Sequence, residues 1–299
     1  MFSCKNNANS KETVHMLCPR NIYSRNGVEI VYHYSYGTKE GEIDFSSKEL
    51  YSIEKYDSLG NIIYYKGSYY PSITDVALST YHYEIRKELD LPWNTTYTYK
   101  MEYQDTTFLK ASLFDTEGTY IARIEKSIKE NVVHDSVYVR DRLIYVKHIF
   151  KDVEGRDSLI LSYDEYRRKI TLVEEEQKVY SKNGNTIRED YITKTKDIIS
   201  RNPNKFDIRK GFSEFTYDEQ GRVVAQNHGR IKRYAKYDER GFIVESIIEN
   251  DFEKSKSLYK STYYNNGLLK NSSGYADMSI LESYSEYEYN YYKYSPNQE

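Results

Sequence analysis

The sequence predicts an all-β fold, an antiparallel meander of β-hairpin repeats that forms an extended, curved or partly rolled sheet. A short motif recurs along the chain: an aromatic residue, Asp or Ser, two variable residues and Gly. Between its copies, apolar and polar residues alternate with the period of two that is typical of strands. Tyr contributes 35 of the 299 residues, against 10 Phe and 1 Trp. Because a Tyr ring packs against cross-strand neighbours while its hydroxyl stays in water, this composition favours a thin sheet over a compact sandwich.

Each copy of the motif is explained as a β-hairpin turn. Asp or Ser at the first turn position hydrogen-bonds to backbone N–H groups further along the chain. Gly at the fourth position adopts the left-handed conformation, and a type I turn that closes with a glycine bulge is a common hairpin connection. The copies start at Tyr23, Tyr56, Phe114, Tyr180, Tyr217, Tyr237 and, in a looser form, Tyr263. The predicted structural turn residues are Asp57, Gly60, Asp115, Gly118, Gly184, Asp218, Gly221, Asp238, Gly241 and Gly267.

Residues 1–20 are predicted to be a flexible tether, and residues 21–299 a single β-repeat domain. Within the domain, apolar residues alternate or run together over strand-like lengths. The clearest such segments are residues 28–36, 62–65, 97–103, 142–146 and 158–162.

Three other segments have less regular patterns. Residues 75–93 fit a short helix as well as they fit strands. Residues 192–210 are polar and contain Pro203, which predicts a loop and a weak boundary between two repeat blocks. Residues 284–294 alternate Tyr with polar residues and are predicted to form a last strand that covers the open end, as terminal caps do in repeat proteins.

Charge and motif content exclude several classes of function. The net charge is -3 and shows no basic stripe, so nucleic-acid binding is not expected. No cofactor motif is present, and the six histidines lack the spacing of metal ligands. His134-Asp135-Ser136 holds the residue types of a hydrolase triad, but triad members converge from separate positions, so this run is interpreted as a polar loop. Each repeated turn supplies one carboxylate where a calcium loop supplies several, so no metal site is predicted.

The amino terminus resembles the processing region of a bacterial lipoprotein. Ser3 stands where such proteins have a small residue, Cys4 stands at the lipid-acceptor position, and a polar stretch follows. The resemblance implies a Gram-negative cell-envelope protein, held at the outer membrane or cell surface only through a lipid on Cys4. The alternative is a cytoplasmic protein in which Cys4 has no such role. Cys4 and Cys18 are the only cysteines, so no disulfide framework is expected.

The motif also resembles the YD repeats of rearrangement-hotspot (Rhs) proteins. Tyr56-Asp57…Gly60, Tyr217-Asp218…Gly221 and Tyr237-Asp238…Gly241 carry this resemblance, each followed by apolar strand residues. In large members of that family, repeated hairpins wind into a hollow β-shell. For this shorter chain the resemblance implies a small YD-repeat lipoprotein with hairpin geometry and no encapsulated domain.

These patterns predict a non-enzymatic binding or scaffold module for a protein or glycan partner. Tyr is a preferred contact residue at interfaces, and Tyr97, Tyr99 and Tyr103 alternate on one predicted strand. These three residues are the candidate binding face. Two alternatives stay open: an enzyme that acts on polysaccharide through a pair of carboxylates, and a cytoplasmic immunity or antitoxin partner.

Overall fold

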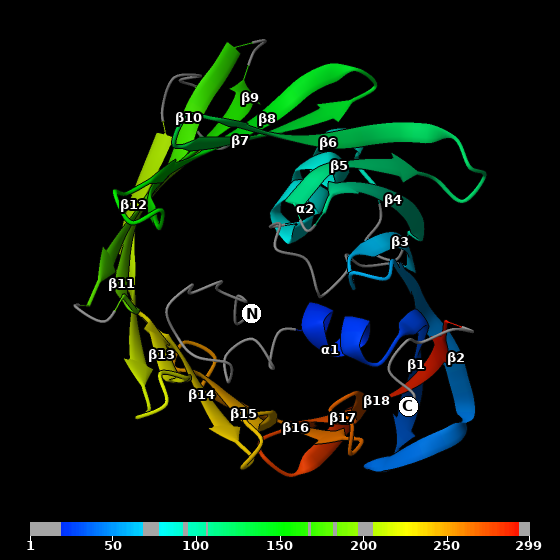
Figure 1. Cartoon of the computed structure of the whole chain (residues 1–299). Coiled ribbons are helices and arrows are strands. Elements are labelled where there is room, and N and C mark those ends of the chain that lie inside the picture. Colours follow the sequence, from blue (N-terminus) through cyan, green and yellow to red (C-terminus); the bar gives the residue numbers. More distant parts are fainter. Residues whose placement is uncertain are drawn as a thin grey trace.

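The computed structural model describes residues 19–67, 78–91, 95–105, 107–166, 169–181, 184–196 and 206–292. They form two helices and one sheet of 18 strands, coloured along the chain in Figure 1. The helices are α1 (Pro19–Arg25) and α2 (Leu78–Leu89). The first nine strands are β1 (Val28–Lys39), β2 (Glu42–Tyr56), β3 (Ile62–Gly67), β4 (Tyr97–Gln104), β5 (Thr107–Phe114), β6 (Tyr120–Lys129), β7 (Val132–Val139), β8 (Arg142–Lys151) and β9 (Asp157–Tyr166). The other nine are β10 (Lys169–Tyr180), β11 (Thr186–Lys196), β12 (Phe206–Tyr217), β13 (Val223–His228), β14 (Ile231–Tyr237), β15 (Ile243–Asn250), β16 (Ser255–Tyr263), β17 (Leu269–Ala276) and β18 (Ile280–Tyr291).

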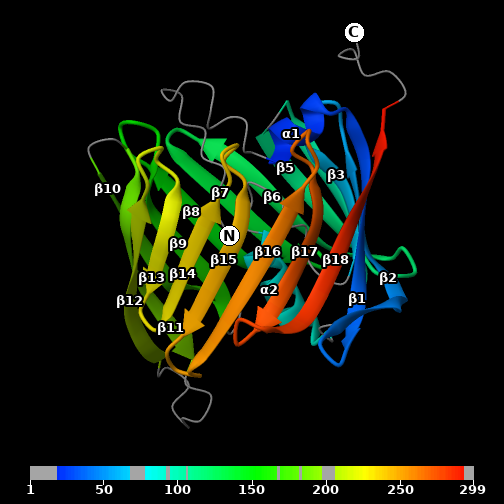
Figure 2. The same cartoon turned by 90° about the horizontal axis from the view of Figure 1, so that it is seen from below.

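The sheet closes on itself and forms a barrel. Each strand pairs antiparallel with the next, and β1 pairs with β18 from Val28↔Tyr291 to Tyr36↔Tyr284. The meander prediction is confirmed, whereas the expected extended or partly rolled sheet is wrong. The predicted last strand exists, but it joins the first strand instead of covering an open end (Figures 1 and 2). Closure leaves no unpaired outer strand, which removes the edges that an open sheet exposes to aggregation.

The structure tests the expected secondary structure of two irregular segments. The helix alternative for residues 75–93 is the one observed, as α2. The loop expected over residues 192–210 is wrong at both ends, because β11 extends to Lys196, β12 begins at Phe206, and these two residues are register partners. Its middle part, residues 197–205 with Pro203, lies outside the described residues. Residues 1–18 of the expected tether lie outside the described residues, and the two that follow belong to α1.

Both helices lie inside the ring of strands, in the space that we call the lumen (Figure 1). Tyr23 of α1 packs on Tyr56 of β2, with ring centroids 4.6 Å apart. The Tyr81 hydroxyl of α2 donates a hydrogen bond of 2.5 Å to Asp135 of β7. These wall residues therefore face the lumen, and because side chains alternate along a strand, their neighbours in sequence face outward.

The hydrophobic core occupies one side of the lumen. Apart from Leu268, every member of the core lies between Tyr23 and Tyr145 in the sequence. Its fully buried side chains include Ile85 of α2 and Tyr99 of β4. The barrel is thus filled where α1 and α2 pack against the wall formed by the early strands.

The recurrent motif forms the same turn at most of its copies. At Asp57, the carboxylate accepts hydrogen bonds from the backbone N–H groups of Leu59 and Asn61, at 2.9 and 2.8 Å. Equivalent bonds occur at Asp115, Asp218 and Asp238, and the glycines of these turns have φ between 77 and 89°. The copy at Tyr23 is an exception, since it lies within and after α1 instead of in a hairpin. Apart from the Asp115 turn, the motif turns follow even-numbered strands and so share one end of the barrel, the turn rim.

The motif tyrosines connect neighbouring strands of this rim. The hydroxyls of Tyr217, Tyr237 and Tyr263 donate hydrogen bonds to the carbonyl groups of Thr186, Val223 and Ile243, at 2.6, 2.8 and 2.9 Å. Each acceptor is the first residue of the preceding strand. The aromatic position therefore anchors the end of one strand to the start of its neighbour, which explains why Tyr recurs at this offset.

Candidate ligand-binding site

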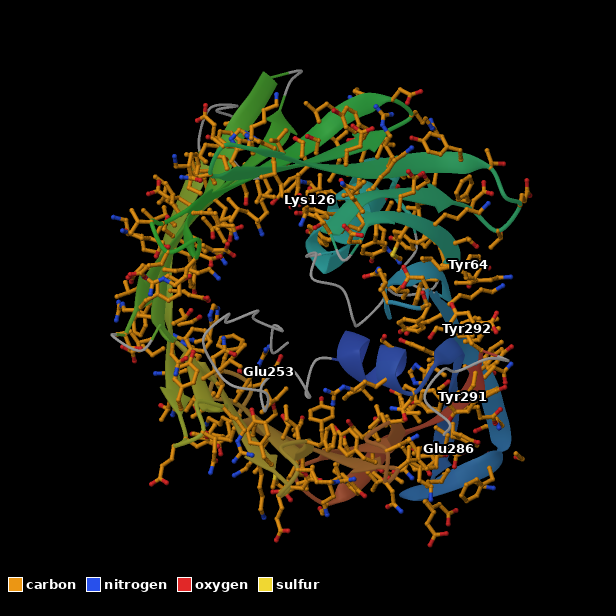
Figure 3. All side chains as sticks on the ribbon, in the orientation of Figure 1. Tyr64, Lys126, Glu253, Glu286, Tyr291 and Tyr292 are labelled. Atoms are coloured by element: carbon orange, nitrogen blue, oxygen red, sulfur yellow. The ribbon has the colours of Figure 1, made fainter. Side chains whose placement is uncertain are left out.

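A pocket of about 600 Å³ opens at the turn rim, where the sheet closes. It lies between the turn that joins β16 to β17 and the last residues of β18. Its lining residues are Tyr264, Asn265, Asn266, Glu288, Tyr289 and Tyr291. Figure 3 labels Tyr291 and Tyr292, which lie on the side of the ring that holds α1.

The pocket exists because β17 and β18 separate near the rim. Their described pairing ends at Asn271↔Glu286, whereas β18 continues to pair with β1 as far as Tyr291. The edge of β18 that faces β17 is therefore left without a strand neighbour over its last residues. Because side chains alternate, Glu288 approaches the opening from the outward face, and Tyr289 and Tyr291 approach it from the lumenal face.

Several contacts hold the turn beside the pocket in place. Asn26, which follows α1, donates a hydrogen bond of 3.2 Å from its side-chain amide to the carbonyl of Asn266. Leu268 is buried in the core, and the Tyr289 hydroxyl donates a hydrogen bond of 2.7 Å to the carbonyl of Leu269. One wall of the pocket is thus tied both to the core and to the helix in the lumen.

The lining combines aromatic rings with a few polar groups, which is the usual composition of a small-molecule site. Tyr264 and Tyr291 are 42% and 48% exposed, so their rings are open to a ligand. Tyr264 meets Tyr289 edge to face, with ring centroids 6.4 Å apart. Burial raises the pKa of Tyr289 and Tyr291, so both hydroxyls stay protonated at neutral pH. Asn265, Asn266 and Glu288 add amide and carboxylate groups, which exchange hydrogen bonds with hydroxyls.

A second group of ionisable residues lies in the lumen, next to α1. Glu54 is 7% exposed and accepts a hydrogen bond from the Tyr56 hydroxyl. Burial raises the pKa of Glu54 to about 7. On the neighbouring strand, burial lowers the pKa of His33 to about 4, and its ring stacks on Tyr287 with centroids 4.5 Å apart. This group belongs to the packing between α1 and the wall.

The arrangement of a hydrolase is not formed by the described residues. His134, Asp135 and Ser136 are consecutive on β7, so they alternate between the two faces of the wall, and their interpretation as a loop is wrong. Elsewhere in the lumen, Ser213 Oγ lies 2.6 Å from His228 Nδ1. The other ring nitrogen of His228 lies 3.2 Å from the Tyr191 hydroxyl, whereas a triad requires a carboxylate in that position.

The residues predicted as a binding face lie in the hydrophobic core or pack against it. Tyr97 and Tyr99 are 1% and 0% exposed, and Tyr103 is partly buried against the core. Their alternation is genuine, but their common face points into the lumen, where the helices cover it. Burial places them in or against the core, and their contact with a ligand stays a prediction. Cys4, the predicted lipid acceptor, lies outside the described residues.

Sequence reasoning missed the pocket, although two of its features are visible in the sequence. The alternating tail contains Tyr289 and Tyr291, and the looser motif copy contains Tyr264, Asn265 and Asn266. Their proximity depends on barrel closure, which no local pattern predicts. Within the described ranges, no group of three or more His, Cys, Asp or Glu residues is placed to hold a metal ion. Neither described helix has the length and apolar character needed to cross a membrane.

Comparisons with known proteins gave no family for the chain and a likeness to solved structures of porin-like proteins. No family model matches the chain, and no curated protein matches it. The chain is similar to the solved structure of a porin-like protein from Bacteroides vulgatus, with 10% identity, a TM-score of 0.38, and coverage of 64% of this chain and 94% of that one. It is also similar to a porin-like protein from Bacteroides uniformis, with 12% identity, a TM-score of 0.30, and coverage of 88% and 98%. The YD-repeat and Rhs-like interpretation is wrong, since the described strands form a closed barrel instead of an open hairpin repeat.

Proposed function

We propose that this chain is a non-enzymatic barrel of the bacterial cell envelope, and that it binds a glycan in the pocket between β18 and the turn that joins β16 to β17. The observation that carries the proposal is the lining of that pocket by three tyrosines, two asparagines and one glutamate. The face of a tyrosine ring stacks on the C–H face of a sugar, while amide and carboxylate groups exchange hydrogen bonds with the sugar hydroxyls. A pocket of about 600 Å³ is large enough for a short oligosaccharide.

The charges on the wall favour a barrel whose outer surface faces water. Tyr289 packs on Tyr23 in the lumen, so Glu286 and Glu288 of the same strand face outward. Register partners of an outward residue also face outward. From β18 to β14, successive partners on this face are Tyr284 (β18), Ser273 (β17), Lys260 (β16), Glu245 (β15) and Lys236 (β14).

Ion pairs strengthen this argument. Lys256 and Glu249 lie opposite each other on β16 and β15, with a separation of 2.8 Å between Nζ and the carboxylate. Arg188 of β11 and Glu214 of β12 also lie opposite each other, with 3.1 Å between the guanidinium nitrogen and the carboxylate oxygen. A lipid-facing barrel instead carries an outward apolar band about 25 Å tall, in which charged side chains are destabilising. We therefore propose that the wall is solvated and that any membrane attachment is through Cys4.

The envelope location has its own test. Cells that express the chain would be labelled with a radioactive or clickable fatty acid, and the Cys4→Ser variant would serve as the control. Label on the wild type that is lost in Cys4→Ser supports lipid anchoring. If the wild type takes up no label and fractionates with cytoplasmic markers, the envelope proposal is wrong.

Glycan binding is tested with a panel of oligosaccharides and ligand-observed NMR. We expect one or more glycans to bind, and the Tyr264→Ala/Tyr291→Ala variant to lose at least about tenfold in affinity, since stacking on each ring contributes about 1 kcal/mol. Tyr234→Ala is the matched control, because Tyr234 has similar exposure (39%) but lies on β14, away from the pocket. Both altered tyrosines are exposed, so the double variant should keep the wild-type melting temperature. Failure of every glycan to bind at millimolar concentration, or undiminished binding by the double variant, would overturn the proposal in favour of a protein partner or another site.

A further inference from the structure

A second pocket lies at the opposite end of the barrel, on its outward face. It has a volume of about 290 Å³ and is formed by β3, β4, β5 and the turn after β5. Tyr65 and Tyr99 of β3 and β4 are buried in the core, so their sequence neighbours, which line this pocket, face outward. Its lining includes Tyr64, Lys66, Lys100, Phe114 and Asp115.

Three lysines make this pocket locally positive. Lys66 and Lys100 line it, Lys55 lies beside it, and none of the three forms an ion pair with the described residues. Two of the ammonium groups instead lie over aromatic rings, with Lys55 Nζ 5.3 Å from the centroid of Tyr64 and Lys100 Nζ 4.9 Å from that of Phe114. On β14 and β16, by contrast, the outward lysines lie in register with glutamates of β15.

Asp115, the one carboxylate among the described lining residues, does not neutralise these lysines. Asp115 uses one carboxylate oxygen to accept hydrogen bonds from the backbone N–H groups of Glu117 and Thr119, at 3.0 and 2.8 Å. That bonding holds the turn, and no ion pair joins Asp115 to the lysines among the described residues. A chain with a net charge of -3 therefore presents a local cluster of three cations beside two aromatic rings.

We infer that this outward pocket binds a sugar ring that carries an anionic group, a carboxylate or a sulfate. Lys66 and Lys100 bind the anion, and the rings of Phe114 and Tyr64 contact the apolar face of the sugar. Lysine ammonium groups pair with both anions, while the aromatic rings supply the apolar contact that an inorganic ion does not use. The site is separate from the pocket at the turn rim, so it does not depend on glycan binding there.

The test compares three oligosaccharides of equal length by isothermal titration of the full chain: a uronate, a sulfated sugar and a neutral sugar. We expect an anionic ligand to bind at least about tenfold more tightly than the neutral one, and its affinity to fall between 50 and 300 mM NaCl because salt screens exposed charges. The relative affinities of the uronate and the sulfated sugar identify the source of the anion. Equal binding of the neutral sugar would overturn the inference.

Variants then assign the binding to this pocket. Lys66→Gln/Lys100→Gln should lose at least about tenfold in affinity for the anionic sugar, and Phe114→Leu should lose several-fold while keeping the charge. Lys232→Gln/Lys256→Gln is the matched control, because it removes two exposed outward lysines elsewhere on the wall and should bind like the wild type. Tyr264→Ala/Tyr291→Ala should also keep this binding, which separates failure here from failure of the rim pocket. An equal loss in the lysine control, or no loss in Lys66→Gln/Lys100→Gln, would show that the pocket is not the site.

Discussion

The two sides of the barrel wall have the same backbone pairing but different lumenal faces. From β1 to β8, the lumenal face carries apolar and aromatic residues such as Tyr99, Leu113 and Ile124, and α1 and α2 pack on it. From β10 to β16, the lumenal face carries polar groups such as Glu174, Lys178 and Ser213, and no member of the core comes from these strands. The sheet is thus held closed all the way round, whereas hydrophobic stabilisation is concentrated on one side.

This difference shows that closure and core formation are separate in this chain. On the polar side, the strands are joined by ladder hydrogen bonds, by motif turns and by tyrosine hydroxyls that reach the preceding strand. On the filled side, ladder hydrogen bonds and motif turns act together with buried apolar area. Substitutions should therefore differ in effect between the two sides where the core is involved, and agree where it is not.

Truncation of a lumenal tyrosine should be much more damaging on the filled side. Tyr99→Ala removes a fully buried ring from the core and is expected to lower the free energy of unfolding by about 3–5 kcal/mol. Tyr191→Ala, on β11, removes a half-buried ring that stacks on His228 and should lower it by about 1 kcal/mol. Urea denaturation of the two variants measures the difference. Equal losses would mean that the polar side has a core of its own.

The buried carboxyl beside α1 should make stability depend on pH. Because burial raises the pKa of Glu54 from 4.5 to about 7, the folded state keeps a proton that the unfolded chain releases over this range. The stabilisation from Glu54 is therefore complete below pH 4.5 and is lost as the pH rises through about 7. Relative to the wild type, Glu54→Gln should become more stable by about 3 kcal/mol between pH 4.5 and pH 8. Glu175→Gln, an exposed site on β10, is the matched control and should show no such change.

The comparison with wild type at each pH is needed because His33 acts in the opposite direction. Burial lowers the pKa of His33 from 6.5 to about 4, so its contribution is present above pH 6.5 and is lost as the pH falls through 4. In the wild type the two trends offset each other between pH 4.5 and 6.5. A difference curve for Glu54→Gln that is flat with pH would show that Glu54 is not buried as a protonated acid.

The glycine turns should contribute equally to stability on both sides of the barrel. Gly118, between β5 and β6, has φ +82°, and Gly221, between β12 and β13, has φ +78°. A Cβ at either position would meet no close atom, so Ala introduces only the strain of the left-handed conformation, about 1 kcal/mol in each case. Thermal unfolding of Gly118→Ala and Gly221→Ala should give similar losses. A much smaller loss at Gly221 would indicate that the polar side is already loosely held.

Outward ion pairs should contribute least to the free energy of unfolding, and they should contribute equally on the two sides of the barrel. Glu249→Ala breaks a pair on the polar side, and Glu102→Ala breaks the exposed pair with Lys110 on the filled side. Each substitution should change the free energy of unfolding by less than about 0.5 kcal/mol, since exposed pairs are screened by salt. A loss above 1 kcal/mol at Glu249 would mean that charge pairing, and not turn geometry, holds the polar side together.

The sequence predicted local structure well because local chemistry determines it. The Asp-x-x-Gly turns follow from side-chain capping and from the left-handed conformation that Gly accepts. The alternation of apolar and polar residues also predicted strands, as in the segment that contains Tyr97 and Tyr99. What alternation does not reveal is which face is covered. The face of Tyr97 and Tyr99 was interpreted as exposed because the docking of α1 and α2 is a contact between distant segments.

Closure and the candidate site were unpredictable for the same reason. The pairing of β1 with β18 joins the two ends of the chain, and the rim pocket exists only because β18 continues along β1 after β17 has ended. Tyr264 and Tyr291 belong to different elements, and neither position is distinctive by itself among 35 tyrosines. The YD-like motif describes how hairpins turn, and turns of this kind are compatible with an open sheet as well as with a barrel.

The most direct test of this account is a cross-link across the closure of the barrel. Tyr32 of β1 and Glu288 of β18 are register partners on the outward face. In a background in which Cys4 and Cys18 are replaced by Ser, the Tyr32→Cys/Glu288→Cys variant should form an intramolecular disulfide on mild oxidation, identified by peptide mass spectrometry. Tyr32→Cys/Lys232→Cys, with its second site on β14, should not. Free thiols at positions 32 and 288 in a folded protein would contradict the closed barrel.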